Sequence, residues 1–176
     1  MTLKISDFDT RYMKLALSEA KKAYDIGEIP VGCVIVDSMR GEVIAQSHNV
    51  MQLNKNPNFH AEMLAIDIAC KKKDNKNLSN CDIYVTLEPC TMCASAISNA
   101  RINRLYYAAS DLKQGAVENG VRFYTSNSCM HRPEIYSGIN AHESIALIES
   151  FFSKLRKNKL HSRCCWVINV TNLSKI

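Results

Sequence analysis

Residues 82–108, DIYVTLEPCTMCASAISNARINRLYYA, place one short helical segment between two β-rich segments. Asp82–Leu87 and Arg104–Ala108 are dominated by Val, Ile, Leu, Thr and Tyr, a composition typical of strands, whereas Met92–Asn99 has the pattern of a short helix. A strand, a helix and a strand in this order predict β-α-β alternation.

A hairpin and a further helix are predicted upstream. Val31–Asp37 and Glu42–Ser47 are short β-rich runs, and residues 38–41, SMRG, form a suitable connection between them. These runs should pair as antiparallel strands. After a polar loop, the segment from His60 to about Lys71 is apolar enough to predict a mostly buried helix.

Two amphipathic helices are predicted at the ends of this region. The first begins near Ser6 or Asp7 and ends before Gly27, and its apolar residues at helical spacing are Met13, Leu17, Ala20 and Tyr24. The last helix is predicted at Ala141–Lys157, and the side chains expected on its inward face are Ile145, Ile148, Phe152 and Leu155. With a fifth strand at Glu134–Ser137, the elements predict an α/β fold: a mixed five-stranded sheet sandwiched between helices.

The composition fits one domain. The chain has 176 residues, of which 47% are hydrophobic, and no apolar run approaches the length of a membrane span. Asp7 and Asp9 interrupt the start of the chain where a signal peptide needs continuous apolar residues, so we expect a cytoplasmic protein with reduced cysteines. The net charge of +5 favours an acidic partner such as nucleic acid.

We expect the domain to comprise residues 1–160 and to be followed by an extension of unknown structure, residues 161–176. The extension contains the vicinal pair Cys164-Cys165 and an apolar patch, Trp166–Val170. An extra strand, a partner-binding segment and a disordered tail all remain open for it.

The chemistry is indicated by two motifs, His60-Ala61-Glu62 and Pro89-Cys90-Thr91-Met92-Cys93. Two cysteines and one histidine bind zinc and leave a fourth position for water, as a catalytic zinc site requires. The helix starts predicted beside Cys90 and Cys93 favour their thiolate forms. The motifs therefore predict one zinc ion per chain, held by His60, Cys90 and Cys93.

Glu62 is predicted to transfer protons rather than to bind the metal. Two thiolates cancel the formal charge of zinc and weaken its effect on water, so a base is needed nearby. Glu62 can take the water proton and return it to the ring nitrogen and then to departing ammonia. Residues two apart on a helix point about 200° away from each other, so His60 should lie at or before the helix start with non-helical backbone angles.

Each motif also has a plainer interpretation. HxE occurs by chance on helices, and CxxC can be a redox pair or a structural clip. A closed structural zinc site needs a fourth ligand, which Cys70, about 15 Å along the helix, and Cys81, at the far end of its strand, cannot supply. Cys33 and Cys129 remain open as fourth ligands. A zinc-stabilised RNA-binding module without catalysis also remains open.

HxE followed by PCxxC is the pattern of zinc nucleobase deaminases. From Thr10 to Lys157 the chain resembles the bacterial-type tRNA-specific adenosine deaminases. The stretches that carry the resemblance are Glu28–Gly32 (EIPVG), Asn49, His60–Glu62 (HAE), Val85–Cys93 (VTLEPCTMC), Asp111–Gly115 (DLKQG), His131–Ile135 (HRPEI) and Phe151-Phe152. The resemblance implies a cytidine deaminase-like three-layer α-β-α sandwich, a homodimer, and hydrolysis of the wobble adenosine of a tRNA anticodon to inosine.

The resemblance also implies residues that bind the base. Asn49 is expected to hydrogen-bond it, while Ile29, Val31 and Ala61 line the pocket. The plainer interpretations are a turn-capping amide for Asn49 and strand-edge core for Ile29 and Val31.

RNA contacts are expected because an unpaired loop nucleotide has to be splayed into the pocket and its phosphates held. The candidates are Lys113, His131, Arg132, Phe151, Phe152, Lys154 and Arg156. The basic run at 154–159 can equally be a solvated helix end.

Ser153 stands where the family typically has arginine, and Cys33 where it has alanine. A deaminase of a free nucleobase or nucleoside, of guanine or cytosine type, is the alternative on the same fold.

Overall fold

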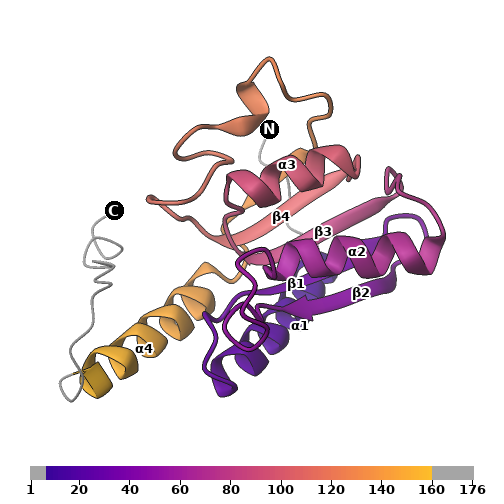
Figure 1. Ribbon diagram of the computed structural model, residues 1–176. Coiled ribbons are helices and arrows are strands. Elements are labelled where there is room, and N and C mark those ends of the chain that lie inside the picture. Colours follow the sequence, from indigo (N-terminus) through magenta and orange to yellow (C-terminus); the bar gives the residue numbers. More distant parts are fainter. Residues whose placement is uncertain (1–6, 160–176) are drawn as a thin grey trace.

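A computed structural model describes residues 7–159 as a five-stranded sheet with helices on both faces (Figure 1). The elements are α1 (Asp7–Asp25), β1 (Gly32–Asp37), β2 (Glu42–His48), α2 (Ala61–Lys73), β3 (Cys81–Leu87), α3 (Thr91–Asn99), β4 (Arg104–Ala109), the 3₁₀ turn η1 (Phe123–Thr125), β5 (Glu134–Ser137) and α4 (Ala141–Lys159). The predicted three-layer α/β fold is confirmed, and each predicted helix and strand is present. The turn η1 was not anticipated.

The sheet is mixed and has the order β2-β1-β3-β4-β5. β1 is antiparallel to both β2 and β3, whereas β3, β4 and β5 are parallel to one another. Because Gly32 pairs with His48 and Leu87 pairs with Ala109, the start of β1 and the ends of β2, β3 and β4 lie at one edge of the sheet. Ligand sites of open α/β sheets lie at such an edge, beyond the carboxyl ends of the parallel strands.

Both faces of the central strands are buried, and this explains their continuous apolar sequences. One set of side chains packs with α2 and α3: Cys33, Ile35, Ile83, Val85, Leu105 and Tyr107. The alternate set packs with α1: Val34, Val36, Tyr84, Tyr106 and Ala108. Figure 1 shows these two helix layers on opposite faces of the sheet.

Small residues bring the helices close to the sheet. The buried face of α2 contains alanines at four-residue spacing, Ala61, Ala65 and Ala69. At Gly32 an added Cβ would lie 2.0 Å from the Ala16 carbonyl oxygen of α1, so only glycine allows this approach.

The part of the chain that the structure describes contains no helix with the length and apolar character needed to cross a membrane. The expected extension, residues 161–176, and the expected helix start at Ser6 lie outside the described residues.

Candidate metal centre and active site

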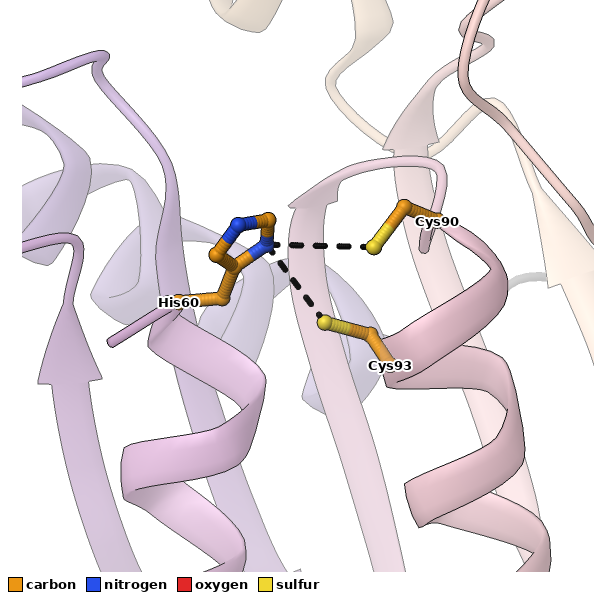
Figure 2. Close-up of side chains that lie close together, drawn as sticks. All are labelled: His60, Cys90 and Cys93. Atoms are coloured by element: carbon orange, nitrogen blue, oxygen red, sulfur yellow. Dashed lines mark hydrogen bonds between the residues drawn. The ribbon is translucent and has the colours of Figure 1, made fainter. Parts of the chain in front are cut away.

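Two loops at the ligand edge of the sheet bring three metal-binding side chains together (Figure 2). His60 Nδ1 lies 3.8 Å from Cys90 Sγ and 3.6 Å from Cys93 Sγ, and the three atoms all lie within 4.8 Å of one another. His60 precedes α2, and the cysteines lie at the start of α3. The two helices thus supply the cluster from opposite sides.

The cluster has the dimensions of a zinc site. Zinc binds imidazole nitrogen at about 2.0–2.1 Å and thiolate sulfur at about 2.3 Å, so a tetrahedron separates nitrogen from sulfur by about 3.6 Å. The observed separations of 3.6 and 3.8 Å match this edge. Nitrogen and sulfur donors are also the set that zinc prefers. His60, Cys90 and Cys93 therefore fit a zinc ion without rearrangement.

Within residues 7–159, no other His, Cys, Asp or Glu side chain joins the three ligands. Cys129 instead donates its thiol hydrogen to the His131 carbonyl oxygen and lies 3.6 Å from Ser98 Oγ. Cys33 lies in the core on β1. Neither of the two fourth ligands left open by the sequence is used, so the described residues form an open site.

The backbone at the ligands follows the predicted geometry. His60 has φ −73° and ψ 152°, and Cys90 has φ −71° and ψ 173°. Both are extended residues that precede a helix, so the prediction of a non-helical His60 is confirmed. Because both helices begin here, their positive ends face the thiolates.

Hydrogen bonds between the two cysteines decide which thiol ionises in the metal-free chain. The Cys93 thiol donates to Cys90, and together with His60 it holds the pKa of Cys90 at about 4. The same hydrogen bond and burial raise the pKa of Cys93 far above its usual range. Cys90 is therefore the more acidic of the two thiols, and zinc would displace the proton of Cys93.

Glu62 is buried beside this cluster, only 3% exposed, and its Oε2 has no hydrogen-bond partner. Burial raises the pKa of its carboxyl group to about 7. A buried oxygen without a partner is costly unless something binds there. This carboxylate is placed to serve a group that enters the site.

The comparisons with known proteins agree with this geometry. Residues 6–109 match the family model described as the cytidine and deoxycytidylate deaminase zinc-binding region. The chain is 52% identical to the tRNA-specific adenosine deaminase of Rickettsia typhi, over 82% of this chain and 97% of that protein. It is 48% identical to the one from Agrobacterium fabrum, over 84% of this chain and 95% of that protein.

The chain belongs to the family of tRNA-specific adenosine deaminases.

Solved structures extend the comparison to the fold. One, from a study of A-to-I editing by tRNA:A34 deaminases at the wobble position of transfer RNA, superposes with a TM-score of 0.76 at 48% identity and covers 78% of this chain and 99% of that one. A guanine deaminase from Nitrosomonas europaea gives a TM-score of 0.73 at 18% identity, covers 86% of this chain and 87% of that one, and so shares the fold alone.

In this member of the deaminase family, Asn49 connects the segments around the site. Its Oδ1 accepts the Ala61 N–H at 2.9 Å and its Nδ2 donates to the Ile29 carbonyl at 3.1 Å. Asn49 thus accepts a hydrogen bond from the first residue of α2. Its second amide hydrogen is not used by these contacts.

The other expected pocket residues of the deaminase lie in or against the core. Val31 and Ala61 are buried, and Ile29 is half-buried against the same cluster that α2 and α3 form with the sheet. Asn49 is hydrogen-bonded to Ile29, Val31 and Ala61. The four residues expected to bind the base therefore lie together, next to His60.

The expected RNA contacts are divided between surface and interior. Lys113 lies on a cavity of about 310 Å³ that is also lined by Cys90, Thr91 and Met92. Arg132, Lys154 and Arg156 are exposed, and the Lys154 ammonium lies 5.4 Å from the centre of the Tyr24 ring.

Two of the residues expected to contact RNA, Phe151 and His131, make contacts inside the protein instead. Phe151 is 5% exposed and packs edge-on against Tyr24 and Phe152, which places it in the core between α1 and α4. His131 Nε2 donates to the Ile102 carbonyl at 2.6 Å, so its ring holds the β4–β5 connection in place. Phe152 is half-buried. Helical periodicity predicted Phe152 as the inward ring, but the inward ring is Phe151.

Sequence reasoning missed one acidic residue at the site, Glu88. It lies two residues before Cys90 and is 3% exposed. Its only signal in the sequence is a charge directly after an apolar strand, which more often marks a solvated loop.

Proposed function

We propose that the protein hydrolyses the wobble adenosine of a tRNA anticodon to inosine, with one zinc ion held by His60, Cys90 and Cys93. The observation that carries this proposal is the three-ligand cluster with the buried carboxylate of Glu62 beside it, one oxygen of which has no hydrogen-bond partner. The sequence identity to tRNA-specific adenosine deaminases over nearly their whole length supports the substrate.

The reaction needs a nucleophilic water and a group that moves both of its protons. Zinc, when bound, supplies Lewis acidity that makes water nucleophilic near neutral pH. Glu62 accepts one proton of that water and passes it to the adjacent ring nitrogen; it then takes the second proton from the new C6 hydroxyl and passes it to the departing amine, which leaves as ammonia. The C6–O bond forms first, with protonation of the ring nitrogen, and the bond between C6 and the amine breaks afterwards, so adenosine becomes inosine without any redox step.

Buried backbone and amide groups orient the base. The remaining N–H of Asn49 is the donor that this proposal assigns to an acceptor on the purine. Ile29 and Val31 form the apolar side of the pocket, and Ala61 leaves room beside His60 because its side chain is a single methyl group. Since these residues are held by the Asn49 hydrogen bonds, the pocket is formed before RNA binds.

Exposed cations hold the RNA phosphates. Lys113 lies on the cavity beside Cys90, and Arg132, Lys154 and Arg156 are exposed on the β4–β5 connection and on α4. The half-buried ring of Phe152 offers a stacking surface. Phe151 and His131 support these elements from inside.

We further propose that the chain acts as a cytoplasmic homodimer, as its family resemblance implies. In the β4–β5 connection Leu112 and Met130 are 52% and 84% exposed, and they offer apolar surface for a second copy. Light scattering at micromolar concentration should give twice the chain mass.

The decisive experiment measures inosine in a defined anticodon stem-loop with and without a zinc chelator. Inosine should form, disappear with the chelator and return with added zinc. Release of ammonia from free guanine or cytosine, with none from the stem-loop, would support a free-base deaminase instead.

Glu62→Gln tests the proton-transfer role. The variant should bind one zinc ion per chain and lose at least about a thousandfold in kcat, because the base is removed while the ligands stay. Glu19→Gln is the matched control, because Glu19 is equally buried but lies in α1 on the other face of the sheet. Wild-type turnover by Glu62→Gln would refute the assigned role.

A further inference from the structure

Glu88 is a buried carboxylate that the proposed chemistry does not use. Its two oxygens accept five hydrogen bonds, all from one segment, Asp111–Asn119. Oε1 accepts from the backbone N–H groups of Val117, Glu118 and Asn119 at 3.1, 2.9 and 2.9 Å. Oε2 accepts from the Asp111 N–H at 3.0 Å and from Asn119 Nδ2 at 2.6 Å.

Glu88 supplies the hydrogen-bond acceptors that a helix or strand would otherwise give to the N–H groups of this segment. Residues 110–122 form neither helix nor strand, so their N–H groups need partners elsewhere. Three consecutive N–H groups on one oxygen form an anion-binding nest, and bonds to an ionised acceptor are about twice as strong as neutral ones. A single side chain therefore holds both ends of a nine-residue segment.

The clamped segment is pressed against the backbone of a zinc ligand. Gly115 pairs with Cys90 in an isolated β-bridge, and the Ala116 N–H donates to the Pro89 carbonyl at 2.9 Å. A Cβ at Gly115 would lie 2.5 Å from the carboxyl carbon of Glu88, so the segment lies in direct contact with the carboxylate. Glu88 thus controls the distance between this segment and Cys90.

The outer side of the segment is one wall of the cavity beside the metal centre. Lys113, Gln114, Gly115, Gly120 and Val121 face Cys90, Thr91 and Met92 across about 310 Å³. The remaining wall belongs to α3, which packs in the core. The width and shape of the cavity therefore depend on where Glu88 holds the segment.

We propose that Glu88 is a positioning residue for substrate binding, which holds the wall formed by residues 111–121 at the distance from Cys90 that the nucleotides flanking the reacting base require. This inference rests on the proposed function for its substrate. The printed hydrogen bonds of Glu88 all go to residues 111–119 and none goes to His60, Cys90 or Cys93, so its loss should affect KM much more than kcat.

Glu88→Gln is the test variant because it preserves the shape of the side chain. The amide NH₂ of the glutamine would replace Oε2 and face the N–H groups of Asp111 and Asn119. Two of the five hydrogen bonds would be lost, because donors would then face donors. KM for the anticodon stem-loop should rise at least about tenfold, with kcat within about threefold of wild type and one zinc ion per chain.

Limited trypsin digestion reports the position of the segment independently of activity. Lys113 and Arg122 are cleavage sites within or beside it, and both are exposed. Cleavage at these sites should become at least about tenfold faster in Glu88→Gln.

Asp82→Asn is the matched control. Asp82 is equally buried, lies at the opposite end of the same strand and pairs with Arg104. It should lower the melting temperature but leave KM and cleavage at Lys113 and Arg122 unchanged. An unchanged KM in Glu88→Gln, or an equal rise in Asp82→Asn, would overturn the proposal.

A milder variant keeps the test decisive if Glu88→Gln folds poorly. Asn119→Ala removes one of the five bonds and should raise KM about threefold with kcat unchanged. If the wild type produces no inosine, the proposed function fails, whereas the trypsin comparison still decides whether Glu88 clamps the segment.

Discussion

Cys33 and Cys93 show how position determines what a cysteine side chain does. Both are fully buried. Cys93 lies 3.6 Å from His60 Nδ1 at the start of α3, whereas Cys33 lies among apolar side chains on β1. Burial raises the pKa of Cys33 well above its usual value, and the nearby Glu62 raises it further. Cys33 is therefore a neutral core side chain, although it is close to the site.

The two cysteines give a matched pair of variants. Cys93→Ala should lose zinc during dialysis, because a site with two ligands holds the ion far more weakly. Cys33→Ala should keep one zinc ion per chain and lose only about 1 kcal/mol of stability, since one small buried atom is removed. Metal analysis of the dialysed proteins is the measurement. A zinc-free Cys33→Ala would instead make Cys33 a ligand.

At the scale of elements, the approach of α1 to β1 depends on Gly32. An added Cβ would meet backbone atoms of the helix, Ala16 O at 2.0 Å and Ala20 N at 2.4 Å, which cannot rotate away as a side chain can. The Gly32 N–H also donates to Thr86 Oγ1 at 3.1 Å, so the strand cannot shift without breaking this bond. Gly32 thus determines how closely α1 approaches the sheet.

Gly32→Ala should therefore destabilise the protein by more than about 3 kcal/mol. Gly27→Ala is the control: Gly27 has φ +83° with nothing near the added Cβ, so the cost should be about 1–2 kcal/mol of backbone strain. Thermal melts of both variants are compared with wild type. Equal losses in melting temperature would show that α1 moves away from β1 at little cost.

The elements also explain why the ligand motifs work. α2 and α3 both start at the edge where β2 and β3 end, so the residue before each helix projects into the same space. His60 and Cys90 occupy these two positions. Two helix starts that face each other allow a CxxC pair and an HxE motif, thirty residues apart, to form one site.

At the scale of the whole molecule, ion pairs join elements that are distant in the sequence. Asp37, at the end of β1, accepts hydrogen bonds from Lys73 Nζ of α2 at 2.9 Å and from the Met39 and Arg40 N–H groups at 3.1 Å. These bonds, that of Lys73 foremost, lower the pKa of Asp37 below its ordinary value. The neighbouring Cys81 stays neutral, because burial raises its pKa.

This pair predicts a pH-dependent loss of stability. A carboxyl group with a lowered pKa stabilises the fold above its ordinary pKa of about 3.9, and the contribution is lost as the pH falls through the lowered value. The melting temperature of Asp37→Asn should thus lie below wild type at pH 7, and the gap should narrow by pH 3. Loss of zinc in acid affects both proteins and leaves their difference interpretable. A constant gap from pH 7 to 3 would contradict the assignment.

The sequence by itself was sufficient for the order and type of the elements, because apolar periodicity and strand composition are local properties of the chain. It was also sufficient for the metal ligands and for the extended backbone at His60, because ligand chemistry and the 3.6-residue repeat leave few arrangements of HxE. The antiparallel hairpin followed from two β-rich runs joined by residues 38–41, and the β-α-β alternation followed from the order of the segments.

Only the tertiary structure decided which side chains bind or pack against other parts of the protein and which remain free to contact a substrate. Asn49 accepts a hydrogen bond from the first residue of α2, Phe151 packs against Tyr24, and Glu88 clamps a segment more than twenty residues away. These roles depend on partners brought near by the path of the whole chain, and a residue's own neighbours in the sequence do not encode that path. The burial that leaves one oxygen of Glu62 without a partner is decided in the same way, by three segments that meet at one edge of the sheet.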